Sequence, residues 1–158
     1  MSIGITYSLN QRALRVGGQL GKPLGSPADI TTLITDAIFK YRGWAVSGEA
    51  FYRIIHPYNP SDVSVLSIYS GYAWNLQASK VWHKRHEASL RWTEVQPLHT
   101  RRNFQAFWRT RAVGYSYYLK GHRIKAQLYL GIDDRTATLS LPGLRNRLSA
   151  LFQVEFGI

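Results

Sequence analysis

The sequence predicts an all-β fold, a transmembrane antiparallel meander β-barrel of about nine strands, from three observations. Apolar and polar residues alternate over long segments, and because side chains alternate along a strand, each segment has one apolar and one polar face. Pairs such as Lys120-Gly121 and Arg42-Gly43 join these segments, and an X-Gly pair suits the positive φ of a two-residue hairpin turn. The segments run for roughly 10 residues or more, and a tilted strand that crosses a bilayer has about 9–11.

The hairpin of residues 105–134 is the first element that follows from these observations. If Lys120-Gly121 forms its turn, the register is fixed, and one face of the ribbon is apolar while the other is polar. The expected apolar pairs are Tyr117–Ile124, Tyr115–Ala126 and Val113–Leu128, and the expected polar pairs are Tyr118–Arg123, Ser116–Lys125 and Gly114–Gln127.

The hairpin of residues 30–56 repeats this pattern around Arg42-Gly43. The expected apolar pairs are Tyr41–Trp44, Phe39–Val46 and Ala37–Gly48, and the polar pairs are Lys40–Ala45, Ile38–Ser47 and Asp36–Glu49. Two facing carboxylates suggest acid/base chemistry. Because no nucleophile or second functional cluster lies nearby, we interpret Asp36 and Glu49 as a lumen pair balanced by Arg53 and Arg91 from neighbouring strands, and we expect no catalytic residues and no enzyme activity.

The other elements are expected in chain order. Residues 2–9 and 12–20 would form a hairpin around Asn10-Gln11, and further strands would cover residues 70–79, 87–95 and 147–156. A short connection is expected at residues 80–84 and longer loops at 21–29, 56–62, 96–103 and 131–143. Arg109 and Arg111 share the parity of Val113, so we expect them on the apolar side at the level of lipid headgroups, where long basic chains snorkel.

Composition limits the function classes. The net charge of +11 and a pI near 10.2 favour an anionic partner, whether nucleic acid, lipid headgroup or small anion. The absence of cysteine excludes disulfides and thiolate metal sites, and His83 and His86 at a strand end would point apart, so no metal site is expected. No apolar run approaches the roughly 18 residues of a membrane helix, and residues 1–9 lack the features of a secretory signal.

The polar face of the predicted strands is expected to line a basic lumen. Its candidate pore-lining and anion-binding residues are Arg15, Lys40, Arg53, Arg91, Arg123, Lys125 and Arg147, together with the acids Asp36 and Glu49. Aromatic residues near the short turns are expected to form a girdle at the membrane interface, namely Tyr41, Trp44, Trp82, Tyr117 and Tyr118.

Several segments resemble the phosphate-selective porin family (porins O and P), over a stretch similar to the C-terminal half of a family member. They are Ile34-Thr35-Asp36-Ala37, Lys40-Tyr41-Arg42-Gly43, Gly48-Glu49-Ala50-Phe51-Tyr52-Arg53, His86-Glu87-Ala88-Ser89-Leu90-Arg91-Trp92, the run from Gly114 to Lys125, and the run from Arg145 to Phe156. The resemblance implies a barrel of about 16 strands, trimers in the bacterial outer membrane and diffusion of anions such as phosphate. Gly157-Ile158 follow Phe156, whereas such barrels usually end on Phe.

An odd number of strands would put the two chain ends on opposite sides of the membrane, whereas a complete bacterial barrel has an even number. We therefore expect residues 1–158 to form a single barrel or partial-barrel domain whose wall is completed by a second polypeptide, by self-association or by closure into a small barrel.

The predicted function is passive diffusion of small anions through an outer-membrane porin, without a cofactor. The expected partners are outer-membrane lipid, small anions, and either a homotrimer or a completing N-terminal half, and no nucleic acid. Two alternatives stay open: a soluble basic all-β nucleic-acid-binding domain, which would place its aromatics on the basic face, and a small barrel that anchors without conducting.

Overall fold

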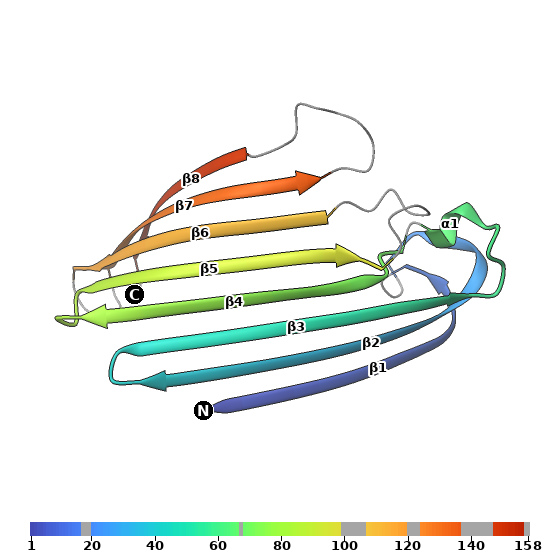
Figure 1. Cartoon of the computed structure of the whole chain (residues 1–158), viewed down its shortest axis with the longest axis horizontal. Helices are drawn as coiled ribbons and strands as arrows, with labels where there is room; N and C mark the ends of the chain where they lie inside the picture. Colours follow the sequence, from blue (N-terminus) through green and yellow to red (C-terminus); the bar gives the residue numbers. More distant parts are fainter. Residues whose placement is uncertain (17–19, 67, 99–106, 120–123, 137–146, 157–158) are drawn as a thin grey trace.

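The computed structural model describes residues 1–16, 20–66, 68–98, 107–119, 124–136 and 147–156. These residues form one antiparallel sheet whose eight strands are hydrogen-bonded in chain order (Figure 1). The strands are β1 (Ser2–Arg15), β2 (Pro23–Tyr41), β3 (Trp44–Pro57), β4 (Gly71–Trp82), β5 (His86–Pro97), β6 (Phe107–Tyr118), β7 (Ile124–Thr136) and β8 (Arg147–Phe156), and one helical turn, α1 (Val63–Leu66), interrupts the series. The all-β antiparallel meander is thus confirmed.

The strands are long and the sheet is open. They contain 10 to 19 residues, whereas strands in soluble domains average about 5–6. Among the described residues, β1 pairs only with β2 and β8 only with β7, so the two edge strands do not close the sheet on each other. No helix within these residues is long and apolar enough to span a membrane.

The predicted N-terminal hairpin is wrong. β1 runs straight through Asn10-Gln11, and most of the expected loop at residues 21–29 belongs to β2, which begins at Pro23. The register shifts between Asn10 and Ala13, and Arg12 has φ 51° while its backbone N–H donates to Asp29 Oδ1 at 2.7 Å. The polar pair therefore marks a β-bulge, which bends a strand without reversing it.

Because the predicted turn at Asn10-Gln11 is absent, β1 begins at the other end of the sheet from the one predicted. The described residues form eight strands where about nine are predicted, so β1 begins and β8 ends at the same end of the sheet, beside the short turns (Figure 1). We call this end the turn end, and the opposite end, which carries the longer connections and α1, the loop end. The expectation that the two chain ends lie on opposite sides is therefore wrong for the strands described.

The two X-Gly hairpins have different outcomes. At Arg42-Gly43 both residues have positive φ, 45° and 81°, and every predicted pair is present, including Asp36 opposite Glu49. In the later hairpin Tyr117 pairs with Ala126 and not with Ile124, so the predicted register is wrong by two residues. A shift of two keeps every side chain on its predicted face, because strand side chains alternate with period two. Lys120 and Gly121 lie outside the described residues.

The turn between β4 and β5 comes later than predicted. β4 continues to Trp82, which pairs with His86, and the turn consists of residues 83–85 where residues 80–84 were expected. His83 and Lys84 take positive φ values of 51° and 56°, and the Arg85 N–H donates to the Trp82 carbonyl at 3.2 Å. The left-handed conformation is thus adopted without glycine.

The only buried apolar cluster among the described residues lies at the loop end, where α1 is found (Figure 1). There Val65 and Ile68 pack on residues of the polar side of β1 and β2. The cluster consists of Ala13, Leu24, Ala28, Ile30, Val65 and Ile68. Asp62 caps α1, since its Oδ1 accepts from the Ser64 backbone N–H at 2.9 Å and from its hydroxyl at 2.7 Å. The bonds from Ser64 hold the pKa of the Asp62 carboxyl below its usual value, while burial raises the pKa of Tyr69 to about 12.

Candidate functional site

The sheet separates its side chains into two faces that continue through all eight strands. Directly paired residues share a face, so the registers join the faces of neighbouring strands. The apolar face includes Ile3 and Ile5, Leu33 and Phe39, Val46 and Tyr52, Leu76 and Ala78, Leu90 and Trp92, Val113 and Tyr115, Leu128 and Leu130, and Phe152 and Val154. The polar face includes Thr6 and Ser8, Asp36 and Lys40, Glu49 and Arg53, Asn75 and Gln77, Ser89 and Arg91, Thr110 and Ser116, Lys125 and Gln127, and Ser149 and Gln153.

Over β4 to β7 the apolar face is the more exposed of the two, whereas residues on both faces of β1 and β8 are largely exposed. Ile5, Leu90 and Phe152 expose 73 %, 62 % and 67 % of their surface, whereas Ser79 and Ser116 on the polar face are buried. Soluble monomers rarely expose an apolar patch of more than a few hundred Å². The sheet thus curves around its polar side chains and leaves its apolar side chains outside.

An aromatic belt lies on the apolar face at the turn end. Tyr41 pairs with Trp44. Trp82 and Tyr117 pair with His86 from the two neighbouring strands, and both rings pack on the His86 ring. Lys80 Nζ lies 5.0 Å from the Trp44 ring centroid, and His86 Nδ1 lies 2.6 Å from the hydroxyl of Tyr115. Four of the five predicted girdle residues are therefore on one face at one level.

Tyr118 does not belong to this belt. It pairs with Lys125 on the polar face, and its hydroxyl donates to Glu87 Oε2. Being next to Tyr117 in the sequence, it must point to the opposite side of the strand. Its assignment to the aromatic girdle is wrong.

A second belt, which the sequence analysis missed, lies on the apolar face at the loop end. Its aromatic part contains Tyr7, Tyr52, Tyr72 and Trp74; Tyr7 and Tyr52 both pair with Leu33 of β2, and Tyr52 pairs with Tyr72. The signal was present as aromatic residues at the apolar positions near the far ends of these strands.

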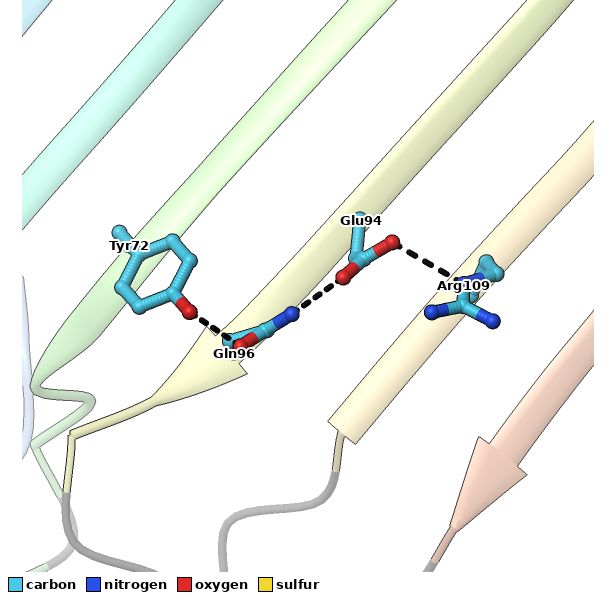
Figure 2. Close-up of polar contacts among 4 residues, drawn as sticks. All are labelled: Tyr72, Glu94, Gln96 and Arg109. Atoms are coloured by element: carbon cyan, nitrogen blue, oxygen red, sulfur yellow. Dashed lines mark hydrogen bonds and ion pairs between the residues drawn. The ribbon is translucent and has the colours of Figure 1, made fainter.

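Polar side chains continue this second belt across β5 and β6 (Figure 2). Tyr72 donates to Gln96, Gln96 donates to Glu94 Oε1, and Arg109 Nε donates to Glu94 Oε2 at 3.0 Å. Glu94 is only 5 % exposed. Arg111 lies next along β6 with its guanidinium 5.9 Å from the Trp92 ring centroid, so both arginines are on the apolar side, as their spacing predicts.

The two belts are separated by an apolar band of nearly constant height. Trp44 and Tyr52 are eight positions apart on β3, and Tyr72 and Trp82 are ten apart on β4. At about 3.3 Å per residue these separations are roughly 26–33 Å along the strand. In a barrel, a strand tilt of about 35–45° would reduce them to roughly 19–27 Å, close to the apolar band of about 25 Å in transmembrane barrels.

The polar face contains a hollow of about 380 Å³ that extends across β4 to β8, and Arg91 is one of the side chains that line it. Its polar lining includes Gln77, Ser89, Arg91, Ser116, Gln127, Tyr129 and Gln153, and no acidic side chain is among the described residues that line it. Arg91 Nε and one terminal nitrogen donate to Gln77 Oε1 at 3.1 and 2.8 Å. Because this partner is a neutral amide, the guanidinium keeps its full charge, and the surrounding amides and hydroxyls supply further donors for an anion.

The other predicted lumen residues are spread over the polar face. Arg53 Nε donates to Thr32 Oγ1 at 3.1 Å, so neither it nor Arg91 balances the facing carboxylates of Asp36 and Glu49 in the way predicted. Within the described part of the chain, the ion pairs are Arg109–Glu94 and Lys125–Glu155, both at 3.0 Å.

Two further predicted lumen residues, Arg147 and Arg15, lie near strand ends. Arg147 lies opposite Asp133, an acid absent from the predicted lumen set. Arg15 donates to the Gly21 carbonyl at 3.2 Å from the irregular end of β1. Arg123 lies outside the described residues.

The polar face is therefore not evenly cationic. Acids face each other on β2 and β3, and Lys125 and Arg147 each lie opposite an acid, whereas the hollow around Arg91 has none. Among the described residues, Arg91 is a cation of this face that lines a hollow without an acidic side chain.

No group of three or more His, Asp or Glu residues in the described ranges is arranged to hold a metal ion. Comparison of the chain with protein-family models, with curated proteins and with solved structures finds no match. The resemblance to the phosphate-selective porins stays a prediction.

Proposed function

We propose that this chain forms part of the wall of a bacterial outer-membrane porin through which small anions such as phosphate diffuse passively. One observation carries the proposal: an exposed apolar face, bounded by two aromatic and polar belts, lies back to back with a polar face along all eight strands. Lipid is the medium in which such a face is buried, and in lipid only helices and closed barrels satisfy the backbone.

The hollow lined by Arg91 is the proposed binding site for anions that pass through the pore. A passing anion exchanges part of its hydration shell for the guanidinium and for the amides and hydroxyls of Gln77, Gln127 and Ser116. Conduction requires that an anion enter favourably and still leave, which suits one cation among neutral donors. Gln77 accepts from two of the nitrogens of Arg91, and because these donors are occupied the interaction with the anion stays moderate.

The connection between β3 and β4, which contains α1, would lie at one mouth of the proposed pore. It packs through Val65 and Ile68 on the polar side of β2, against Ala28 and Ile30. In a barrel that side is the lumen, so α1 would occupy part of the pore mouth at the loop end. The anion path would then pass between this segment and the strands β4 to β8.

The nucleic-acid alternative requires aromatic side chains on the basic face, where bases could stack beside cations. Most aromatics of the described strands instead lie on the apolar face, among them Tyr41, Trp44, Trp82, Trp92 and Tyr115. The distribution favours a membrane wall over a nucleic-acid surface.

Planar-bilayer recording tests the proposal. We expect the refolded full chain to conduct, and the sign of its reversal potential across a potassium chloride gradient to show selectivity for anions. We also expect inorganic phosphate to reduce the chloride current. Arg91→Glu should lower the anion-to-cation permeability ratio about threefold or more, since it replaces the one uncompensated cation of the hollow. Arg111→Glu changes the same charge on the opposite face and is the matched control.

Absence of conductance from inserted protein would reject the pore and leave the non-conducting anchor. A reversal potential that is the same for wild type and Arg91→Glu would reject the assignment of Arg91 to the lumen.

A further inference from the structure

The two edges of the sheet are complementary to each other. We propose that two copies of this chain join edge to edge, β8 of each copy pairing with β1 of the other, and so close one barrel from two eight-stranded sheets. The inference rests on the proposed function, because lipid makes closure obligatory: each unsatisfied backbone group there costs several kcal/mol.

Strand direction permits this junction. Because the described strands are even in number, β1 and β8 are antiparallel, with the start of β1 and the end of β8 both at the turn end (Figure 1). When two copies stand with their turn ends on the same side, β8 of one copy is antiparallel to β1 of the other, as in every pair of the sheet. A twofold axis along the barrel makes the two junctions identical, so the assembly closes and does not propagate.

The faces also match across the junction. On β1 the apolar positions are odd-numbered, as in Ile3, Ile5 and Tyr7, and on β8 they are even-numbered, as in Phe152 and Phe156. A register that pairs odd residues of β1 with even residues of β8 continues both faces without a break. β1 has 14 residues and β8 has 10, so all of β8 can be paired.

Closure of a single copy onto itself is disfavoured by what already covers the polar face. The interior of an eight-stranded barrel is just wide enough for its own side chains. Here residues 58–70 lie on that face, with Val65 and Ile68 buried against β2. Arg53, Arg91 and Tyr129 project from the same face. Two copies double the number of strands and enclose a lumen that has room for both.

Disulfide crosslinking tests the junction cleanly, because the chain has no cysteine. Thr6 and Gln153 lie on the polar faces of β1 and β8. Chains carrying only Thr6→Cys and chains carrying only Gln153→Cys are refolded together into liposomes and oxidised. We expect a covalent dimer in the mixture and none from either variant alone. Leu151→Cys and Glu155→Cys, two residues to either side on the same face, cover the neighbouring registers.

The matched controls are Phe152→Cys and Val154→Cys, which point to the apolar face. Opposite a cysteine at position 6 their Cβ atoms diverge, and a disulfide needs Cβ atoms about 3.5–4.5 Å apart. Crosslinking at these positions equal to that at the same-face positions would overturn the proposed register.

Three further results separate the alternatives. An intrachain disulfide in the double variant Thr6→Cys/Gln153→Cys, seen as a compact monomer, would overturn the proposal in favour of self-closure. Wild-type protein in detergent with the mass of one chain, and no crosslink at any same-face position, would overturn it as well. Crosslinked dimers that do not conduct would support the junction between β8 and β1 and reject the porin function. Conductance without crosslinking would support the porin function and reject the junction.

Discussion

Leu90 and Arg91 are neighbours on β5 and experience opposite environments. Leu90 lies between Ala78 and Val113 and is 62 % exposed. Arg91 lies between Gln77 and Ala112 and lines the polar hollow. In a soluble sheet the apolar face packs on a core and the polar face meets water. Here the apolar face is uncovered and the polar face is the concave one, the arrangement that a membrane wall requires.

The largest expected effect is on the apolar face. Leu90 lies midway between His86 and Glu94, in the middle of the apolar band of β5, so in the proposed barrel Leu90→Arg would place a cation at the bilayer midplane. We expect the free energy of unfolding in liposomes, measured by urea titration, to fall by about 2–4 kcal/mol. Gln127→Arg, on the polar face, is the control and should change it by less than about 0.5 kcal/mol.

An equal loss from the two variants would contradict the assignment of lipid to the apolar face. A larger loss of unfolding free energy from Gln127→Arg than from Leu90→Arg would reverse the assignment, because the polar face would then be the one that is removed from water.

A smaller effect is expected where the turn keeps the two faces in register. Gly43 has φ 81°, and a Cβ there would lie 2.7 Å from the Val81 carbonyl oxygen. Gly43→Ala should therefore lower the free energy of unfolding by about 1–2 kcal/mol, the cost of a left-handed residue with a side chain. Gly48→Ala is the matched control, since its Cβ would meet Leu76 at an ordinary 3.7 Å.

Equal stability of the two alanine variants, by the same urea titration, would mean that the Arg42-Gly43 turn relaxes without cost. The register of β2 and β3 would then depend on their side chains alone.

The side on which a residue lies could be predicted from the sequence, but its exact partner could not. Parity is a local property, so Tyr117 and Val113 are on the predicted face although their partners differ by two residues. Register depends on which residues adopt positive φ, and in this chain Arg12, His83 and Lys84 do so as well as glycine. Asn10-Gln11 therefore has the composition of a turn and lies in a bulge.

For the candidate site too, the face on which each residue lies could be predicted from the sequence, whereas the hollow could not. The pairing of Asp36 with Glu49 and the polar orientation of Arg91 follow from alternation next to a turn. The hollow itself does not, because it combines residues from β4 to β8 whose alignment depends on the registers. The cluster that holds α1 joins Ala13, Leu24, Ala28 and Ile30 to Val65 and Ile68, and nothing local in either group specifies the other.

The smallest expected effect lies within the polar face. Lys125 and Glu155 form an ion pair at 3.0 Å, so together they add no net charge to the proposed lumen. Replacing both, Lys125→Gln/Glu155→Gln, should leave the reversal potential nearly unchanged and lower the free energy of unfolding by less than about 1 kcal/mol, as for other partly exposed pairs. Arg91→Gln removes a single uncompensated charge and should lower the anion-to-cation permeability ratio, whereas Glu155→Gln alone should raise it because Lys125 is released. If the double variant shifts the reversal potential as far as Arg91→Gln does, the cation excess is spread over the whole polar face and the hollow has no special part in it.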